Sequence, residues 1–384
     1  MRRKIVVMIL FILLIFSLSI NFVFYKADIE FYVKAKHYMN KELIINTKSY
    51  SYTDIHNEVL EGTLKFIRDG KREEFPSTMM LFTERFRQAY TPKTEYPRFF
   101  WAEPAWALVA VLEDPLIKGN RDLIKELQQI FDETTIDNEF INVDQSVSSI
   151  AALRLYELTK DQKYMLYANR MYSWLKSLDT EYGILYNNNP NVSIVDCLGM
   201  VVPFLMEYSK YCDSTEAKKL AMKTMECYID KGVDSDTGFP AFSYRLKEPH
   251  IKMGMSNWGR GISYYTIGLN SIIQEDINDS VKIRITMFNN NICALWNDKH
   301  CFGQFVGEGE KKDLSAELPI IYYLFKSNLL HITKNDILEY GKFLHDGIMY
   351  NSSSSNSGII RYGTNIGPNI LAQAFMLKLL NEVK

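Results

Sequence analysis

The sequence has almost no net charge, few cysteines and few histidines, and each shortage excludes a class of function. Its 44 basic and 46 acidic residues give a net charge of −2, so we expect no basic surface for nucleic acid. The five cysteines form no C-x-x-C pair and the six histidines form no pair at i, i+4. Phosphate-binding loops and the serine nucleophile elbow are also missing. We therefore predict neither a metal nor another cofactor. A disulfide between Cys293 and Cys301 is left open.

The N-terminal region predicts a membrane anchor. Three basic residues at positions 2–4 precede residues 5–25, a run of 21 residues without a charged side chain. As a helix this run would extend about 30 Å, enough to cross the hydrocarbon core, with its basic flank in the cytoplasm. A signal peptide cleaved near residues 17–19 is the alternative, and it would make the protein secreted. We expect an anchor at 1–25, a linker at 26–50 and one domain at 51–384 outside the cytoplasm.

The remaining sequence repeats at an interval of about fifty residues. A glycine turn and a short extended piece recur at 182–186, 237–242, 301–305 and 357–362, each after an amphipathic stretch and before an apolar one. The apolar stretches open with polar residues, at gaps of 52, 64, 53 and 52 positions: Asp144, Asp196, Arg260, Asp313 and Asn365. This spacing predicts an all-α chain of helical hairpins.

One more hairpin fits upstream, where residues 99–106 precede an apolar helix at 107–112, which makes six inner helices. Six hairpins can close into a ring, with apolar helices inside and amphipathic helices outside, and an open solenoid is the alternative. In a closed ring the starts of the inner helices meet at one end and form a shared cleft. The polar residues expected there are Asp144, Asp196, Trp258, Arg260, Asp313, Ser315 and Asn365, although some of them would be helix caps.

Two of these residues also have a purely structural explanation. Ser193 and Asp196 spell S-x-x-D, a capping box that would satisfy free amide groups at a helix start. Arg260 lies near the start of its helix, against the positive end of the helix dipole, so an anion should be near it. That anion is either a substrate carboxylate or an internal partner, Asp196 or Asp144.

The sequence around Asp196 resembles glycoside hydrolase families 88 and 105, the unsaturated uronyl hydrolases. The segment that begins at Asp196 reads D-x-x-x-M-x-x-P-F-L, similar to the segment that carries the acid/base aspartate in those families. Residues 258–261 read W-x-R-G, similar to their substrate-binding segment. The resemblance covers nearly all of residues 50–384 and implies the (α/α)6 toroid of the six-hairpin glycosidases.

The resemblance also implies a reaction on an acidic oligosaccharide or polysaccharide. Asp196 would protonate C4 of a C4=C5 unsaturated uronic acid and assist the addition of water at C5, with electrostatic support from Asp144. The hydrated product would be a hemiketal, which opens and releases the rest of the sugar chain. Arg260 would hold the substrate carboxylate, and Trp258 would stack on the sugar ring. Asp313 and Asn365 would be further substrate contacts at the shared end.

The sequence departs from those families near both motifs. Ile262, Ser263 and Tyr264 stand where the families usually have asparagine, glycine and tryptophan, and Phe242 or Ser243 stands where they tend to have histidine. A non-catalytic polysaccharide-binding protein on the same fold is therefore the main alternative. A lyase or epimerase is a third reading, but the sequence does not identify the base that it would need.

Overall fold

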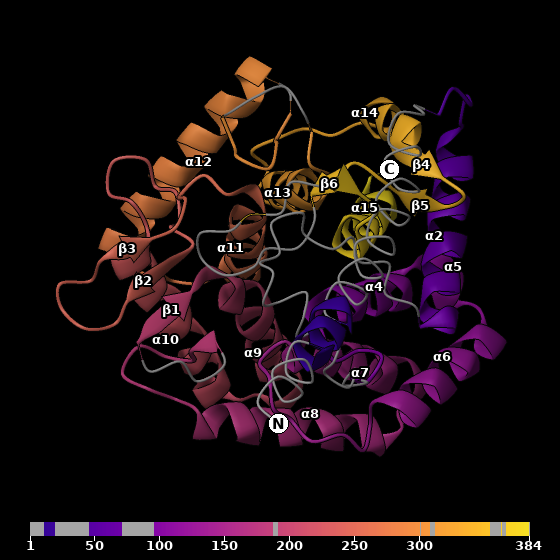
Figure 1. Ribbon diagram of the computed structural model, residues 1–384, viewed down its shortest axis with the longest axis horizontal. Helices are drawn as coiled ribbons and strands as arrows, with labels where there is room; N and C mark the ends of the chain where they lie inside the picture. Colours follow the sequence, from indigo (N-terminus) through magenta and orange to yellow (C-terminus); the bar gives the residue numbers. More distant parts are fainter. Residues whose placement is uncertain are drawn as a thin grey trace.

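The computed structural model describes residues 11–19, 46–70, 96–186, 191–299, 301–307, 312–353, 362 and 366–383. Six helices form an inner ring, which Figure 1 shows in a view along the ring axis. These inner helices are α4 (Ala102–Glu113), α7 (Gln145–Thr159), α9 (Leu198–Cys212), α11 (Gly259–Ile272), α13 (Leu314–Lys326) and α15 (Ile370–Glu382).

An outer layer of helices alternates with the inner ones along the chain and surrounds them (Figure 1). It consists of α2 (Tyr52–Asp69), α6 (Arg121–Thr134), α8 (Gln162–Ser177), α10 (Thr215–Gly232), α12 (Asp279–Lys299) and α14 (Lys334–Leu338), the last continued by the 3-10 helix η3 (Glu339–Phe343). A short helix, α5 (Pro115–Lys118), joins α4 to α6. Each outer helix and the inner helix that follows it make one hairpin.

The ring of inner helices is closed. Each packs against its successor, in the order α4, α7, α9, α11, α13 and α15, and α15 packs back against α4. Closure confirms the predicted all-α toroid, and the open solenoid is wrong.

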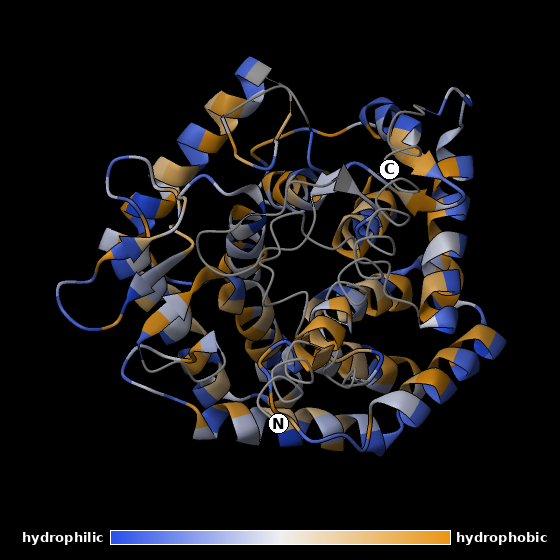
Figure 2. Ribbon diagram, viewed as in Figure 1, coloured by the Kyte–Doolittle hydropathy of each residue, from blue (hydrophilic) through white to orange (hydrophobic). Residues whose placement is uncertain are grey.

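Hydrophobicity separates the two layers. The inner helices α4, α9, α13 and α15 are buried along most of their length, whereas the outer helix α6 buries only Ile124, Leu127 and Phe131. Those three residues are spaced at three and four positions, which gives one apolar stripe on an otherwise polar helix. Hydrophilic residues accordingly concentrate on the outer helices in Figure 2. Outer helices also start at side-chain caps, such as Ser51 on α2 and Asp161 on α8.

Glycines allow the inner helices α9 and α11 to approach closely. A Cβ atom on Gly199 of α9 would lie 2.8 Å from the Cα and carbonyl oxygen of Tyr264 on α11. A Cβ atom on Gly268 of α11 would lie 2.9 Å from the carbonyl oxygen of Leu198. Side chains at either glycine would push the two backbones apart.

The short strands lie in the turns between helices. β1 (Val192–Ile194) pairs antiparallel with β2 (Ser243–Arg245), and β2 pairs with β3 (Lys252–Met253). The two-residue strands β4 (Leu344–His345) and β5 (Ile348–Met349) form a hairpin, and β6 (Ser352–Ser353) pairs with β7 (Ile366–Gly367). Gly183 and Gly238 have φ angles of 81° and 74°, so the predicted glycine turns are present at these two places. The predicted turn at 357–362 lies outside the described residues apart from Tyr362.

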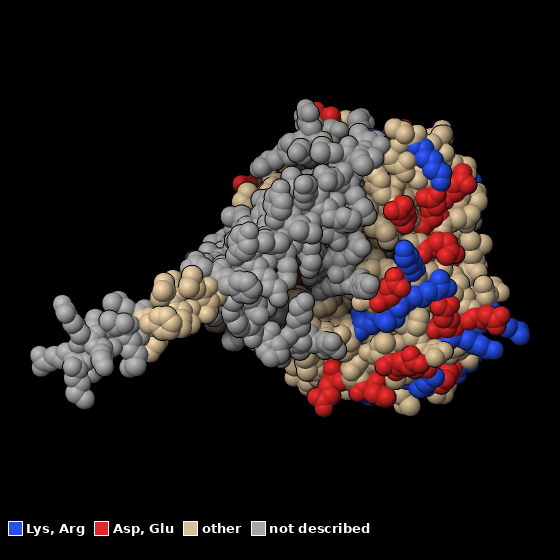
Figure 3. All heavy atoms as spheres, turned by 45° about the vertical axis from the view of Figure 1, so that its right-hand side comes forward, with Lys and Arg blue, Asp and Glu red and all other residues tan. Residues whose placement is uncertain are grey.

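Some expected boundaries are wrong. Helix α4 begins at Ala102 rather than at 107, and α15 begins at Ile370 with Asn369 as its cap, later than the predicted start at Asn365. No disulfide joins Cys293 and Cys301. Basic and acidic side chains alternate on the face shown in Figure 3, in keeping with the small net charge.

Of the predicted anchor at residues 5–25, the structure describes residues 11–19, which are helical. Within the described part of the chain, no helix has both the length and the apolar character needed to cross a membrane.

Candidate active site

Four charged residues stand at the starts of four consecutive inner helices, at one end of the ring. They are Glu103 in the first turn of α4, Asp144 before α7, Asp196 before α9 and Arg260 in the first turn of α11. Closure of the ring brings these helix starts together, as predicted for three of the four residues.

Asp196 lies in η2 (Val195–Cys197), a single 3-10 turn between β1 and α9. Ser193 belongs to β1, so the capping box suggested by S-x-x-D does not form. The Oδ1 atom of Asp196 is buried without a hydrogen-bond partner among the described residues. Burial raises the pKa of the Asp196 carboxyl to about 7; the Glu103 carboxylate adds to the rise and Arg260 opposes it. A carboxyl group with this pKa can donate a proton at neutral pH.

Asp144 precedes α7 but makes no capping hydrogen bond through its side chain. Its Oδ2 atom accepts hydrogen bonds from Asn142 Nδ2 at 3.1 Å and from the Tyr186 hydroxyl at 3.2 Å. Burial, followed by the nearby carboxylates, raises the pKa of the Tyr186 hydroxyl; these carboxylates are Asp144, Asp196 and Glu103. Tyr186 therefore stays protonated and donates to Asp144. All three carboxylates raise the pKa of this one hydroxyl, so all three act electrostatically on the same part of the candidate site.

Glu103 was missed by the sequence analysis. The Tyr264 hydroxyl donates a hydrogen bond to its Oε1 atom at 3.2 Å, which links the start of α4 to α11 across the ring. Tyr264 is the residue that stands where the related families usually have tryptophan. The available signal was the position of Glu103 in the first turn of an inner helix, where the other inner helices carry their polar residues.

Arg260 is 5% exposed and forms no ion pair with any residue that the structure describes. Its Nε and Nη2 atoms donate to the Ser315 hydroxyl at 3.4 and 3.3 Å, and Nη2 also donates to the carbonyl oxygen and hydroxyl of Ser353. The suggested internal pairs with Asp196 and Asp144 are therefore wrong. Nη1 makes no hydrogen bond within the described ranges, so one edge of the guanidinium remains available for an anion.

Asp313 lies behind Arg260 rather than beside the other carboxylates. Its Oδ1 atom caps α13 by accepting from the Ser315 amide at 3.0 Å, and it also accepts from the Ser315 hydroxyl at 2.6 Å. The hydroxyl that Asp313 holds is the one to which Arg260 donates. At 3% exposure, Asp313 is in a position to orient Arg260. Its predicted contact with substrate stays a prediction, and Asn365 lies outside the described residues.

Trp258 is packed into the wall of the ring. It is 3% exposed, with its ring centroid 4.9 Å from that of Phe242 and 5.7 Å from that of Tyr362. Gly261 makes this possible, because a Cβ atom there would lie 2.7 Å from the Trp258 ring. The stacking role predicted for Trp258 is untested. Ile262, the first departure after the W-x-R-G segment, is fully buried in the hydrophobic core.

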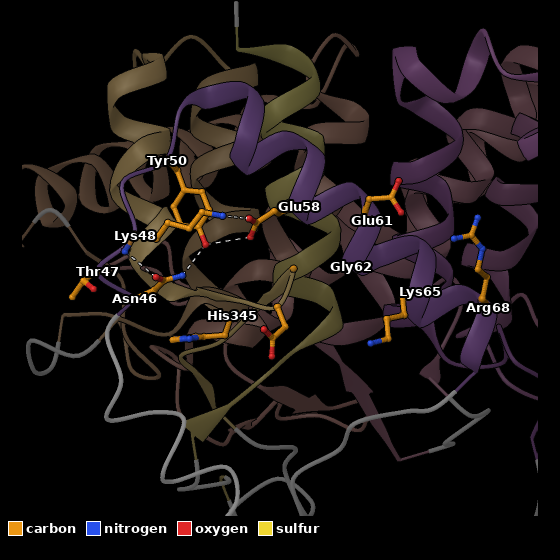
Figure 4. A pocket seen from close by; sticks show the side chains of 12 residues that line it. Asn46, Thr47, Lys48, Tyr50, Glu58, Glu61, Gly62, Lys65, Arg68 and His345 are labelled. Carbon is orange, nitrogen blue, oxygen red and sulfur yellow. Dashed lines mark hydrogen bonds and ion pairs between the residues drawn. The ribbon is translucent and has the colours of Figure 1, made fainter.

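A separate cavity lies on the outer wall, between the chain leading into α2 and the β4–β5 hairpin (Figure 4). Its volume is about 850 Å³. Asn46 donates to the Tyr50 hydroxyl and to the carbonyl oxygen of Leu344, and Lys48 pairs with Glu58. These contacts attach residues 46–50 to the domain. None of the four charged residues at the inner-helix starts lines this cavity.

The described residues contain no group of three or more histidine, cysteine, aspartate or glutamate side chains arranged to hold a metal ion. The charged groups described at the candidate site are three carboxylates and an arginine. A closed (α/α)6 ring with carboxylates and a buried arginine at its helix starts is the six-hairpin glycosidase fold. The sequence model of Glycosyl Hydrolase Family 88 matches residues 94–340, well over half of the chain, so the protein belongs to this family.

Solved structures of glycosidases have the same fold. A possible member of the GH105 family from Salmonella enterica superposes with a TM-score of 0.66 at 15% identity, covering 88% of this chain and 95% of the other. An unsaturated glucuronyl hydrolase specific for heparin gives 0.59 at 13% identity, covering 84% and 96%. The GH76A α-1,6-mannanase from Salegentibacter gives 0.57 at 15% identity, covering 86% and 98%. Among proteins of curated function, no significant match is found.

The raised pKa of Asp196 predicts a pH-dependent effect of Asp196→Asn on stability. The ordinary value is 3.8 and the folded value is about 7, so the wild type loses stability as pH rises through this interval. The asparagine variant cannot ionise, so it should be more stable than the wild type by about 2–4 kcal/mol at pH 8 and equally stable at pH 4. Urea unfolding at both pH values measures this. A stabilisation of the same size at pH 4 would show that ionisation is not the cause.

Proposed function

We propose that this protein is a glycoside hydrolase that acts on acidic oligosaccharides or polysaccharides by hydrating an unsaturated uronyl residue. The observation that carries the proposal is the juxtaposition of a protonatable carboxyl, Asp196, with an arginine that has an unused donor edge, Arg260. Family membership and the fold support it. One of the structural neighbours is an unsaturated glucuronyl hydrolase, which acts on the same class of substrate.

In the proposed reaction, Asp196 gives its proton to C4 of the C4=C5 double bond while water adds at C5. The proton lost by the water returns to a carboxylate, either Asp196 itself or one of its neighbours Asp144 and Glu103. The product is a hemiketal at C5. Its ring opens to a ketone at C5, and the hemiacetal left at C1 releases the remaining sugar chain as an alcohol. Atoms balance with water as the sole co-reactant.

Arg260 would bind the carboxylate of the uronyl group through the Nη1 edge. A guanidinium held from behind by Ser315 and Ser353 has lost most of its freedom before the substrate arrives, which lowers the entropic cost of binding. The starts of four inner helices also point toward the site, and their dipoles favour a negatively charged group.

The test is loss of the ultraviolet absorbance of the C4=C5 bond when the protein is incubated with unsaturated uronyl oligosaccharides. We expect the wild type to remove the absorbance and Asp196→Asn to be slower by a factor of about 10³ or more, because no other group nearby replaces the proton donor. Asp122→Asn on the exposed face of α6 is the matched control and should retain full activity. Equal rates for wild type and Asp196→Asn would remove Asp196 from the mechanism.

Glu103 should control the pH range of this reaction. Because its charge helps to raise the pKa of Asp196, Glu103→Gln should move the alkaline limb of the kcat/KM profile, expected near pH 7, to lower pH. Activity at pH 7 should then fall about two- to fivefold while activity at pH 5 changes little. Glu103→Asp retains the charge and serves as the control. An unshifted limb in Glu103→Gln would contradict this assignment.

A non-catalytic polysaccharide-binding protein remains the second candidate. One observation favours it: Phe242, at a position where the related families tend to have histidine, is packed against Trp258 and offers no polar group. Saturable binding of uronyl oligosaccharides with no turnover would select this candidate.

We further propose that residues 5–25 anchor the protein in a membrane, with the glycosidase domain outside the cytoplasm. The uncharged run of 21 residues behind three basic ones supports this proposal. The protein should sediment with membranes after an alkaline wash, and alkaline phosphatase fused to the C-terminus should be active. Release of the protein into the supernatant would contradict a retained anchor, and an inactive fusion would contradict the orientation.

A further inference from the structure

A second cavity lies in the ring, at the end opposite the candidate active site. Its volume is about 730 Å³, and residues from all six inner helices line it. The lining residues of each helix come from its middle and C-terminal part, whereas the charged residues of the candidate active site stand at the helix starts. We refer to this space as the axial cavity. Its volume falls within the range of small-molecule sites, about 300–1,000 Å³.

The floor of the axial cavity consists of one apolar residue from each inner helix. All six are buried: Trp106, Ile150, Pro203, Ile267, Pro319 and Phe375. A layer of this kind separates the axial cavity from the candidate active site. On most of these helices polar lining residues follow three, four or seven positions later, as Arg154 follows Ile150 and Lys378 follows Phe375; Asn381 follows Phe375 by six positions and Tyr211 follows Pro203 by eight. Spacings of three, four and seven keep residues on the same helix face, and all of these polar residues lie nearer the C-terminal end of their helix.

Four of the seven charged groups on the wall of the axial cavity are paired with one another. Arg154 donates from Nε to Glu113 at 2.9 Å and from Nη1 to Glu207 at 3.0 Å, and Lys378 pairs with the other oxygen of Glu113. Burial would raise the pKa of Glu113, but Lys378 and Arg154 outweigh it and hold this pKa at about 2. In this network two basic groups neutralise two carboxylates, which favours a ligand without net charge beside them.

Two polar atoms of the lining residues have no such partner. The indole Nε1 of Trp106 and the Oδ1 of Asn381 are buried and form no hydrogen bond within the described part of the chain. Trp106 is 5% exposed, and the amide nitrogen of Asn381 donates to the carbonyl oxygen of Ala110 at 3.4 Å, which fixes the orientation of the amide. One atom is a donor and the other an acceptor. Hydroxyl groups of a ligand can serve both, one accepting from the first atom and another donating to the second.

Aromatic rings provide the remaining wall. Trp106 and Tyr322 each pack against Phe375, with ring centroids 5.8 and 5.6 Å apart, and all three line the cavity. Lys378 Nζ lies 5.5 Å from the centre of the Trp106 ring. Such rings pack against the C–H face of a sugar, while hydroxyl groups at its edge take up the polar contacts.

We propose that the axial cavity binds an uncharged saccharide, at a site separate from the candidate active site. The proposal does not depend on the reaction proposed above, because the two sites share no residue and lie on opposite sides of the apolar floor. An acidic sugar should bind this cavity more weakly than a neutral one, since four carboxylates and three basic groups line it.

The test is isothermal titration of the full chain with D-glucose, D-galactose, D-mannose, L-rhamnose and N-acetylglucosamine, and with D-glucuronate as the acidic counterpart. We expect saturable binding of at least one neutral sugar and a weaker response to glucuronate. Trp106→Phe keeps the ring and removes the donor, and Asn381→Leu, near the end of α15, removes the acceptor. Each should weaken binding about tenfold. Asp196→Asn is the control at the other end and should leave this binding unchanged.

Each other result overturns the proposal. Without saturable binding of any neutral sugar, the axial cavity is a structural ion-pair network. Binding that Asp196→Asn weakens, or that both cavity variants leave unchanged, lies elsewhere on the protein. Stronger binding of glucuronate than of every neutral sugar would assign the cavity to an acidic ligand. Far-UV circular dichroism checks that both variants fold. If Trp106→Phe does not fold, Asn381→Leu alone provides the test.

Discussion

The contact between the first and last hairpins is the constraint on which the rest of the structure depends. Gln373 of α15 is fully buried, and its side chain donates to the carbonyl oxygens of Val59 in α2 and of Gly347 in the β4–β5 turn, while it accepts from the Met349 amide. A Cβ atom on Gly62 would lie 1.9 Å from the Gly347 carbonyl oxygen. The seam therefore requires glycine at Gly62 and an amide side chain at Gln373. The seam adds to the packing of α15 against α4, which closes the inner ring.

Closure of the ring has an electrostatic cost, and this cost arises at the candidate active site. When the ring closes, three carboxylates are brought to one end of it, and Asp196 has a buried oxygen with no partner within the described residues. A protein selected for stability alone would supply that partner or replace the aspartate. Arg260 opposes the pKa rise without cancelling it, because its donors are directed to Ser315 and Ser353. Strain of this kind is typical of groups that exchange protons with a substrate.

The repeat was predictable because polar residues mark the starts of apolar helices, and this pattern is visible in a single sequence. The spacing placed Asp144, Asp196 and Arg260 at helix starts, and the resemblance to the six-hairpin glycosidases implied the closed ring that brings these starts to one end. Glu103 escaped because an acidic residue in a first helical turn is ordinary, and its hydrogen bond with Tyr264 joins residues far apart in sequence. The role of Asp313 behind Arg260 escaped for a related reason, since the two residues meet only through the Ser315 hydroxyl. The predicted contact of Asn365 rested on spacing alone.

The axial cavity was not predictable from the local sequence pattern either, because charged residues near helix ends are usually interpreted as exposed to solvent. The closed ring gives its two mouths opposite character. Helix starts surround the candidate active site, so their dipoles favour an anion there; helix ends surround the axial cavity, and their free carbonyl groups favour donors. Arg154 and Lys378 already provide cationic charge at that end, each paired with Glu113. One parallel ring thus favours an acidic group at one mouth and an uncharged hydroxylated one at the other, with a dry apolar layer between them.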